Sequence, residues 1–390
     1  MSSPGLPRLA TRLQGLGTTI FAEMSALAAR TGAINLGQGF PDVDGPSSVI
    51  DDAVAALRSG RNQYAPGWGV PELRSAVAAH QRRFYDLDID AETEVLVTTG
   101  ATEAIAAALL ALVEPGDEII ALEPYYDSYV ACIAMAGGVR VPVTLRAPDF
   151  RLDVDAFRAA VTTRTKVLLI NSPHNPTGTV LDHDELAAIA EIACAHDLVV
   201  VTDEVYEHLT FDSVVHHPLA TYDGMRERTL SISSGGKTFS FTGWKVGWAV
   251  GAPDLVRAVM MAKQFLTFTS GAPLQPAIAG ALALGDDYFR DFQASFQAKR
   301  DRLCAGLSDV GFDVFAPQGT YFVTTDIRPL GYDDGVDFCL TLPERCGVVA
   351  IPTQVFYDDK QAGKPLVRWA FCKQDDVLDA AIERLGSLRS

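Results

Sequence analysis

The sequence lacks the cysteine and histidine spacings that mark disulfide frameworks and metal sites. Its 390 residues contain no Cys-x-x-Cys pair, and most of the cysteines lie in apolar runs, which is typical of buried thiols in a reducing compartment. None of the seven histidines has a carboxylate or cysteine partner at metal-ligand spacing. We therefore expect unpaired thiols and no bound metal. The six cysteines are Cys132, Cys194, Cys304, Cys339, Cys346 and Cys372.

Positive charge and long apolar stretches are also scarce. The formal net charge is -17, whereas binding to nucleic acid or to an anionic membrane requires a basic surface. No window reaches the length of a membrane span, and residues 1–17 lack the continuous apolar segment of a secretory signal. With 48% hydrophobic and 21% charged residues, the chain is expected to be a cytoplasmic globular protein with no nucleic-acid or membrane partner.

Several familiar catalytic motifs are absent as well. The chain has no Gly-x-Ser-x-Gly nucleophile turn, no Walker phosphate loop and no Gly-x-Gly-x-x-Gly after the first expected strand. Residues 86–90 are rich in aspartate but lack the glycine and the distal glutamate of a calcium loop. These absences argue against hydrolase, P-loop and calcium-binding functions.

What the sequence has instead is an alternation of short β-type runs with helical patterns. This alternation is typical of an α/β fold with a mostly parallel sheet. Five of the runs end in polar, Gly-rich or Pro-rich residues, and ligands of open α/β sheets bind beyond the carboxyl ends of parallel strands. We therefore expect the polar residues at these five ends to form one site. The runs are 95–98, 118–122, 166–170, 198–202 and 230–233.

The most informative segment follows the last of these runs. It reads Ser234-Gly-Gly-Lys237, and a second lysine stands at Lys245. A lysine that follows a strand among small residues lies where a cofactor can approach closely, and partial burial would lower its pKa and make it a candidate Schiff-base amine. The alternative is that both lysines are solvated surface charges, which is the common outcome for a lysine taken alone. Motifs elsewhere in the chain favour the first interpretation.

Four motifs together resemble the class I pyridoxal-phosphate aminotransferases. They are Asn175-Pro-Thr-Gly178, Asp203-Glu-Val-Tyr206, Ser234-Gly-Gly-Lys237 with Lys245, and Arg368, in the order and spacing of that family. Asn-Pro-Thr-Gly alone is weak evidence, but the ordered set is specific, and the resemblance covers nearly the whole chain. The chain looks most like the branch of kynurenine and glutamine aminotransferases, which includes the actinobacterial N-succinyldiaminopimelate aminotransferases. The markers of this branch are the segments 35–42, 172–178 and 242–248.

The resemblance implies a fold and a domain organisation. Residues 46–285 would form a large pyridoxal-phosphate-binding domain of three layers around a mostly parallel central sheet. Residues 1–45 would form an N-terminal arm and part of a small domain, and residues 286–390 would complete this smaller α+β domain. The resemblance also implies an obligate homodimer with composite sites, in which Tyr64 reaches the cofactor phosphate across the interface.

The resemblance further implies a role for each site residue. Lys237 would form the internal aldimine with pyridoxal 5'-phosphate and then carry the substrate's Cα proton. Asp203 would face the pyridine nitrogen, and the phosphate would lie at the start of the helix over 101–113, where free N–H groups favour an anion. Arg368 would bind the substrate α-carboxylate through two parallel hydrogen bonds. The cofactor-binding residues would be Ala101, Thr102, Tyr126, Asn175, Asp203, Tyr206, Ser234, Lys237, Lys245 and Tyr64, with Lys237, Asp203 and Tyr206 catalytic; the substrate-binding residues would be Gly39, Asn175, Arg368, Phe21 and Phe268.

Taken one at a time, several of these residues also have ordinary structural interpretations. Asp203 could cap a helix that follows a strand, and Arg368 could form an ion pair on an edge strand. Tyr126 and Tyr206 could be core aromatics, and Gly39 could be a turn glycine. Tyr206 follows Asp203 by three residues, about one helical turn, so both could face one ligand.

The amino donor is the least determined part of the prediction. Aspartate-specific relatives supply an arginine near the segment 263–271, and none stands there, so a strict aspartate preference is disfavoured. Phe21 and Phe268 suggest an apolar channel for a long side chain. The resemblance favours N-succinyl-LL-2,6-diaminopimelate as donor and 2-oxoglutarate as acceptor. Kynurenine, glutamine, methionine and aromatic amino acids remain open, as does a β-lyase acting on cysteine conjugates, whereas a non-catalytic amino-acid sensor is disfavoured by the lack of a helix-turn-helix module.

Overall fold

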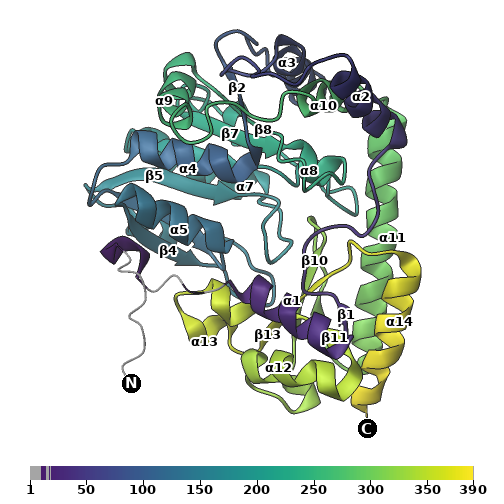
Figure 1. Ribbon diagram of the computed structural model, residues 1–390. Helices are drawn as coiled ribbons and strands as arrows, with labels where there is room; N and C mark the ends of the chain where they lie inside the picture. Colours follow the sequence, from purple (N-terminus) through teal and green to yellow (C-terminus); the bar gives the residue numbers. More distant parts are fainter. Residues whose placement is uncertain (1–9, 15–16, 18, 390) are drawn as a thin grey trace, which may run out of the picture.

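Two sheets organise the chain in the computed structural model, which describes residues 10–14, 17 and 19–389 (Figure 1). The larger sheet has seven strands in the order β2-β8-β7-β6-β5-β3-β4. Its strands pair in parallel except for β8, which is antiparallel to both β2 and β7. The predicted α/β class with a mostly parallel sheet is thus confirmed. The strands are β2 (Val95–Thr98), β3 (Glu118–Glu123), β4 (Val139–Thr144), β5 (Thr165–Asn171), β6 (Val199–Asp203), β7 (Thr229–Ser234) and β8 (Gly247–Gly251).

Helices cover both faces of this sheet, which explains why its strands are nearly continuous apolar runs. On β5, Val167 and Leu169 pack into the core on one face, whereas Leu168 and Ile170 pack into the core on the other. The result is the predicted three-layer arrangement. One face carries α4 (Gly100–Leu112), α5 (Asp127–Ala136) and α9 (Pro253–Lys263); the other carries α2 (Ser47–Arg58), α3 (Pro71–Tyr85), α6 (Val154–Ala160), α7 (His183–Ala195) and α10 (Leu274–Leu282).

The smaller sheet is antiparallel, with the order β12-β13-β10-β9. Both ends of the chain contribute to this part, because Ile34 of β1 pairs with Val348 of β11 and Met24 of α1 shares a core with Trp369. The domain limits at 45/46 and 285/286 stay a prediction, and α11 runs along both parts (Figure 1). The elements are α1 (Ile20–Thr31), β1 (Ile34–Asn35), α11 (Asp286–Val310), β9 (Asp313–Phe315), β10 (Phe322–Asp326), α12 (Gly335–Cys346), β11 (Val348–Val349), β12 (Ile351–Pro352), α13 (Lys360–Gly363), β13 (Leu366–Ala370) and α14 (Asp375–Leu385).

Local sequence signals set several of the helix ends. At the start of α7, Asp182 and Glu185 form a reciprocal capping box, which satisfies two otherwise free N–H groups. The hydroxyl of Thr19 accepts the N–H of Ala22 at 3.3 Å and begins α1, and Gly32 ends it at a φ of +66°. Short 3-10 helices complete the chain at η1 (Thr11–Leu13), η2 (Leu219–Thr221), η3 (Arg328–Leu330), η4 (Thr353–Phe356) and η5 (Gly386–Arg389).

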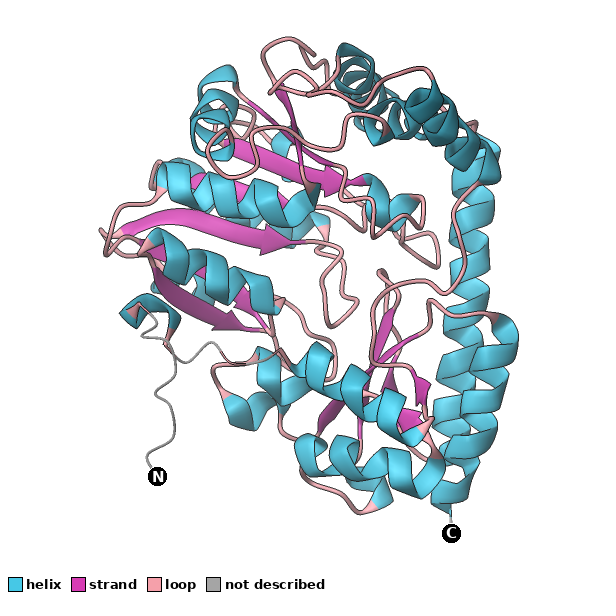
Figure 2. Cartoon of the chain, viewed as in Figure 1, coloured by secondary structure: helices cyan, strands magenta, loops and turns pink. Residues whose placement is uncertain are grey.

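The cysteines and the helix lengths test two expectations from composition. All six cysteines are free, as predicted, but only three of them, Cys132, Cys339 and Cys372, are buried. Cys304 and Cys346 are partly exposed and Cys194 is exposed. In the part of the chain that the structure describes, no helix is both long and apolar enough to cross a membrane. The carboxyl ends of the parallel strands point toward the middle of the molecule, beside the smaller sheet (Figure 2), and this edge carries the candidate site.

Candidate active site

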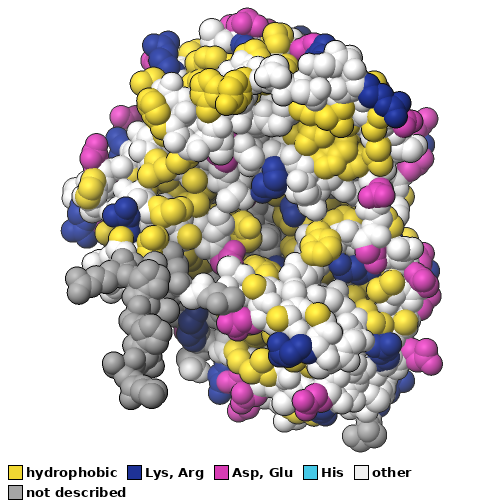
Figure 3. Space-filling view, in the orientation of Figure 1, with side chains coloured by type: hydrophobic (Ala, Val, Ile, Leu, Met, Phe, Trp, Pro, Cys, Tyr) yellow, Lys and Arg dark blue, Asp and Glu magenta, His cyan; other side chains and the backbone are white. Residues whose placement is uncertain are grey.

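One cavity lies at this edge of the sheet and has a volume of about 300 Å³. Lys and Arg side chains are visible at the middle of the corresponding molecular face (Figure 3). All five predicted strand ends contribute to the lining, so the predicted convergence is confirmed. The lining residues are Phe21, Gln38, Gly39, Gly100, Ala101, Thr102, Ile105, Tyr126, Tyr129, Asn171, Asn175, Asp203, Val205, Tyr206, Ser234, Gly236, Lys237, Thr242, Lys245, Val246, Phe322 and Arg368.

The charge in this cavity is opposite to that of the whole chain. Its described lining holds three cations, Lys237, Lys245 and Arg368, against one carboxylate, Asp203, although the chain carries a formal charge of -17. Such a local excess of positive charge favours a ligand with more than one anionic group. The electrostatics therefore suit a phosphorylated group together with a carboxylate.

Lys237 follows β7 in the short helix α8 (Gly235–Thr238). Its Nζ donates a hydrogen bond to the hydroxyl of Tyr321 at 2.7 Å. Burial lowers the pKa of Lys237 to about 8, although the Cys372 sulfur and the Asp203 carboxylate act in the opposite direction. An amine with this pKa is partly uncharged near neutral pH, which nucleophilic attack and proton transfer both require.

Asp203 is the last residue of β6 and is 5% exposed. Its Oδ2 accepts the hydroxyl of Tyr129 at 2.6 Å, and its Oδ1 accepts the N–H of Val205 at 3.4 Å. Burial raises the pKa of the carboxyl, while the two hydrogen bonds and the charge of Lys237 oppose the rise. The helix-cap interpretation is wrong, because turns rather than a helix follow the strand.

Tyr206 and Asn175 line the same cavity from two loops. The spacing argument for Tyr206 needs correction: turns over 204–209 replace the assumed helix, yet they still bring its side chain to the cavity beside Asp203. Burial raises the pKa of Tyr206, so its hydroxyl stays protonated. The N–H of Asn175 donates to Asn171 Oδ1 at 2.7 Å, which fixes the Asn-Pro-Thr-Gly loop on the end of β5.

The start of α4 and Lys245 lie side by side at an end of the cavity that is suited to an anion. Gly100 opens the helix with a φ of +74°, and a Cβ on it would stand 3.1 Å from Nζ of Lys245. Ala101 and Thr102 follow in the first helical turn, where N–H groups have no partner within the helix. Ser234 lines this end from β7. A helix start beside a lysine favours a phosphate group.

Arg368 lies in β13, between β12 and β10, and is 1% exposed. Its Nη2 donates to the Gly37 carbonyl at 2.8 Å and its Nη1 to Asn175 Oδ1 at 3.2 Å, while its buried Nε has no hydrogen-bond partner. The edge-strand ion-pair interpretation is therefore wrong. Burial lowers the pKa of the guanidinium to about 10. A buried cation bonded only to neutral oxygens is suited to bind a ligand carboxylate.

Three further predicted residues, Phe21, Gly39 and Tyr126, also line the cavity. Phe21 lies at the start of α1, and its ring centroid is 5.1 Å from Cζ of Arg368. Gly39 is needed for close packing rather than for a turn, because a Cβ on it would stand 2.5 Å from Phe322. Tyr126 lines the cavity at the start of α5, and burial raises the pKa of its hydroxyl to about 12.

Comparison with known proteins identifies the family of the chain. The family model for aminotransferases of class I and II matches residues 31–385. The chain belongs to this family. A Mycobacterium tuberculosis protein named probable N-succinyldiaminopimelate aminotransferase DapC is 57% identical over 97% of this chain and 98% of its own length. The solved structure of N-succinyldiaminopimelate aminotransferase from that organism has a TM-score of 0.96 and covers 98% of this chain and 100% of its own. The methionine aminotransferase of Escherichia coli is 40% identical over 99% of this chain and 100% of its own length.

Two predicted site residues lie outside the cavity of this aminotransferase chain. Tyr64 is 82% exposed and Phe268 is 52% exposed, and neither lines the described cavity. Their rings meet edge to face, with centroids 5.3 Å apart. Neither residue therefore reaches the cavity of its own chain, and a role of either residue at a partner's site stays a prediction.

Sequence reasoning missed several lining residues of the aminotransferase. Tyr129 fixes the Asp203 carboxylate, and Asn171 fixes the Asn-Pro-Thr-Gly loop. Gln38, Thr242 and Phe322 also line the cavity. Asn171 and Thr242 lie inside or beside motifs that the sequence did single out, so proximity to those motifs could have found them. Tyr129 and Phe322 occur in ordinary apolar contexts that carry no such signal.

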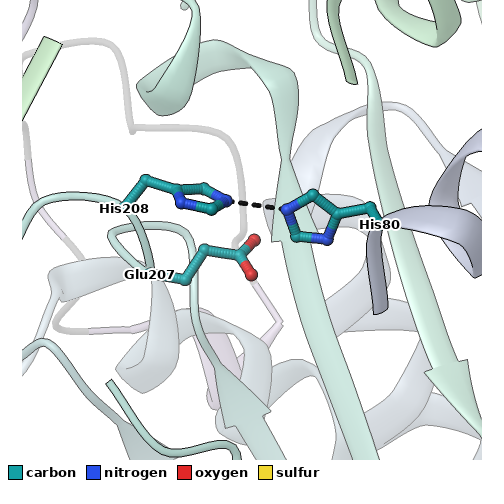
Figure 4. Close-up of side chains that lie close together, drawn as sticks. All are labelled: His80, Glu207 and His208. Carbon is teal, nitrogen blue, oxygen red and sulfur yellow. Dashed lines mark hydrogen bonds between the residues drawn. The ribbon is translucent and has the colours of Figure 1, made fainter. Parts of the chain in front are cut away.

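A cluster of three side chains outside the lining of the aminotransferase cavity was also missed. His80, Glu207 and His208 offer ligand atoms within 4.8 Å of one another (Figure 4), although His80 and His208 are far apart in sequence. The two Nε2 atoms are 2.7 Å apart, and burial lowers both histidine pKa values. Glu207 already accepts hydrogen bonds from the hydroxyls of Tyr85 and Ser233. The contacts describe a hydrogen-bonded pair of neutral imidazoles, and the absence of a metal from the protein stays a prediction.

Proposed function

We propose that this aminotransferase uses pyridoxal 5'-phosphate and that Lys237 is the residue that bonds to it. The observation that carries the proposal is the presence, in one cavity, of an amine with a pKa of about 8, the buried carboxylate of Asp203 and the buried guanidinium of Arg368. Three cations and one carboxylate fit a cofactor and substrate that bring a phosphate, a carboxylate and a protonated ring nitrogen. The bound cofactor supplies a ring that withdraws electrons from the substrate α-carbon.

Each side chain of the site then has a separate proposed role. Asp203, held by Tyr129, would keep the ring nitrogen protonated. Lys237 would carry the proton that leaves the α-carbon, because its pKa allows it both to accept and to return a proton near neutral pH. The phosphate would be held at the start of α4 and the substrate carboxylate by Arg368. The other proposed contacts are Asn175 and Tyr206 at the ring oxygen, Tyr126 on the ring face, Ala101, Thr102, Ser234 and Lys245 at the phosphate, and Gly39, Asn175 and Phe21 at the substrate.

For the reaction, we propose transfer of the amino group of N-succinyl-LL-2,6-diaminopimelate to 2-oxoglutarate, in the biosynthesis of lysine. The support is the 57% identity, over nearly the full length of both chains, to the M. tuberculosis protein of that name. The segment 263–271 contains no arginine, which disfavours a strict aspartate preference. A methionine aminotransferase at 40% identity and kynurenine–oxoglutarate transaminases at about 36% make methionine and kynurenine the competing donors.

A second cavity gives room for a long donor side chain. It shares Phe21 and Tyr126 with the first cavity and has a volume of about 700 Å³. Its described lining contains the carboxylates of Glu23 and Asp127 but no lysine or arginine. A succinyl carboxylate would therefore find no ion-pair partner there, whereas N–H groups of an amide or an aniline would find acceptors. This lining makes glutamine and kynurenine necessary comparisons.

The experiment that tests the function compares amino donors on the purified enzyme. Formation of glutamate from 2-oxoglutarate is followed with N-succinyl-LL-diaminopimelate, methionine, kynurenine, glutamine and aspartate, and release of ammonia and pyruvate from a cysteine conjugate measures β-lyase activity. We expect kcat/KM to be highest with the succinylated donor. A higher value with any other donor would contradict the substrate assignment while leaving the aminotransferase activity in place.

We also propose a homodimer with composite sites. The segment 261–268 carries four exposed apolar side chains, and one of them, Phe268, contacts the ring of Tyr64. They are Met261 (59% exposed), Phe265 (83%), Leu266 (48%) and Phe268 (52%). Exposed aromatic clusters of this kind are typical of subunit interfaces. Burial of these side chains in a dimer would bring Tyr64 and Phe268 to the site of the neighbouring subunit. Neither residue lines the described cavity of its own chain.

Mixing two defective variants tests the composite site. Lys237→Ala and Tyr64→Ala homodimers are each expected to be impaired, whereas dissociation and reassociation of the mixture should restore activity, because mixed dimers contain one site with both wild-type residues. The activity of the mixture is compared with that of each variant treated alone. A mixture no more active than the better homodimer would contradict a shared site.

Lys245 provides a prediction about cofactor affinity. We expect Lys245→Ala to raise the Kd for pyridoxal 5'-phosphate by roughly 10- to 100-fold, the usual effect of losing one charge-assisted contact, and to leave kcat within a few-fold at saturating cofactor. Equilibrium dialysis gives Kd, and steady-state assays give kcat. A loss of kcat that excess cofactor does not restore would mean that Lys245 takes part in the chemistry.

We further propose a cytoplasmic location without a nucleic-acid partner. All six cysteines are unpaired, which suits a reducing compartment, and the formal net charge of -17 disfavours a polyanionic partner.

A further inference from the structure

Tyr321 contacts the reacting lysine without lining the cavity. It stands just before β10 and is 0% exposed. Its hydroxyl oxygen accepts the 2.7 Å hydrogen bond from Nζ of Lys237, while the hydroxyl proton is donated to the carbonyl of Gly39. Because Gly39 takes the only proton of the hydroxyl, the lone pairs of the oxygen are left to accept from the amine.

The backbone and the ring of Tyr321 are held from several sides. Its carbonyl accepts the N–H of Phe371 at 2.9 Å, and the neighbouring Thr320, at a φ of +66°, donates its N–H to Leu209 at 2.9 Å. The ring lies edge to face with Tyr206, at a centroid distance of 5.2 Å. A hydroxyl supported in this way presents a fixed acceptor to a flexible lysine side chain.

The hydroxyl cannot itself act as a base for the amine. Burial raises the pKa of Tyr321 well above its ordinary value, with the neighbouring Tyr206 acting in the same direction, so the phenol stays neutral. Nζ of Lys237 also lies 5.3 Å from the ring centroid of Tyr321 and 5.6 Å from that of Tyr206. The proximity of these two aromatic rings favours the ammonium form of Lys237 over the free amine.

We propose that Tyr321 is a positioning residue that holds the amine of Lys237 in one orientation for its reactions with the cofactor and with the substrate α-proton. The inference rests on the proposed function, in which Lys237 is the reacting amine. It adds a contact from the smaller part of the chain to a lysine in α8, which follows β7 of the larger sheet. The orientation of the amine then depends on how the two parts pack together.

The test measures the amine in the cofactor-free protein. Wild type and Tyr321→Phe are treated with an amine-selective acylating ester over a range of pH, and peptide mass spectrometry quantifies labelling at Lys237, with Lys245 as an internal reference. Wild-type labelling should rise through a midpoint near pH 8, because only the uncharged amine reacts. Loss of an acceptor that stabilises the ammonium should move the midpoint of Tyr321→Phe to lower pH by about one unit.

Steady-state kinetics of the cofactor-loaded proteins complete the test. For Tyr321→Phe we expect kcat to fall about tenfold, the effect of one lost hydrogen bond, with little change in the donor KM because Tyr321 does not line the cavity. The matched control is Tyr357→Phe, which also loses a buried hydroxyl that donates to a carbonyl, here that of Leu145 at 3.1 Å. It should behave as wild type in both measurements.

The proposal is overturned if the wild type is active and the midpoint pH of Lys237 labelling is the same in Tyr321→Phe as in wild type. The melting temperature shows whether Tyr321→Phe folds. If it does not, a fluorinated tyrosine at position 321 keeps the ring and the hydroxyl but weakens the oxygen as an acceptor. The midpoint pH of Lys237 labelling must then also move downward, by a smaller amount. A wild type that transaminates no donor would instead refute the proposed function, and the labelling midpoints would still decide the contact.

Discussion

Lys237→Ala is expected to lower the rate of transamination by about four orders of magnitude, the upper range for removal of a proton-transferring group. No other amine in the described cavity can replace it: Lys245 lies at the start of α4 beside Gly100, at the end of the cavity that is suited to an anion. The rate is measured with N-succinyl-LL-diaminopimelate and 2-oxoglutarate at saturating cofactor, so that weaker cofactor binding does not enter the result.

A covalent readout separates this role from a loss of folding. Wild type is incubated with pyridoxal 5'-phosphate, reduced with borohydride and digested, and the labelled peptide is expected to contain Lys237. Lys237→Ala should show no label there and should melt near the wild-type temperature. The exposed Lys166 on β5 supplies the matched control, and Lys166→Ala should keep full activity. Activity of Lys237→Ala within tenfold of wild type would refute the assignment.

Arg368→Ala is expected to raise KM for the amino donor and for the 2-oxo acid together and to lower kcat/KM by roughly 10²- to 10³-fold, because losing one partner of a buried charge pair costs about 2–5 kcal/mol. The guanidinium lies 5.1 Å from the ring of Phe21 in the described cavity, and both substrates carry an α-carboxylate. Lys237 should keep its reaction with the cofactor in this variant, since its contact with Tyr321 is untouched.

Two control variants test whether the effect of Arg368→Ala is specific. Arg368→Lys retains the charge but not the forked geometry, and an intermediate kcat/KM is expected. Arg328 is an arginine near the same sheet that pairs with Asp326 and is exposed, so Arg328→Ala should leave both KM values unchanged. A rise in KM for only one of the two substrates, or unchanged kinetics, would remove Arg368 from the carboxylate site.

The strand ends were predictable from the sequence because each carries its own local signal. The apolar run before Ser234 and the small residues before Lys237 place the lysine correctly, and the same holds for Asp203 at the end of β6 and Ala101 at the start of α4. Parallel pairing then brings these ends together whatever the exact register, since all carboxyl ends of a parallel sheet share one edge.

Contacts across the two parts of the chain could not be predicted in this way. Tyr321 reaches Lys237, and Arg368 reaches Asn175, only after β10 and β13 are packed against the larger sheet. The pair of His80 and His208 depends in the same way on how α3 packs. No local pattern encodes such long-range partners.

Local geometry also differs from expectation where the helical period was assumed, between Asp203 and Tyr206. The segment after Asp203 is expected to be helical, but it forms turns instead. These turns bring Tyr206 to the cavity and Glu207 to its hydrogen bond with Ser233. Phe268, at a φ of +66°, and Tyr64 face outward, which a single-chain sequence argument cannot distinguish from a site position.

The central claim, that this chain moves an amino group through a cofactor bound at Lys237, is tested most directly by a half-reaction. Purified wild type loaded with pyridoxal 5'-phosphate is mixed with N-succinyl-LL-diaminopimelate and no acceptor. We predict a change in the visible absorbance of the cofactor and release of about one equivalent of 2-oxo acid per site, reversed by 2-oxoglutarate with formation of glutamate. No absorbance change and no 2-oxo acid with this donor or with methionine, kynurenine, glutamine or glutamate would contradict the account.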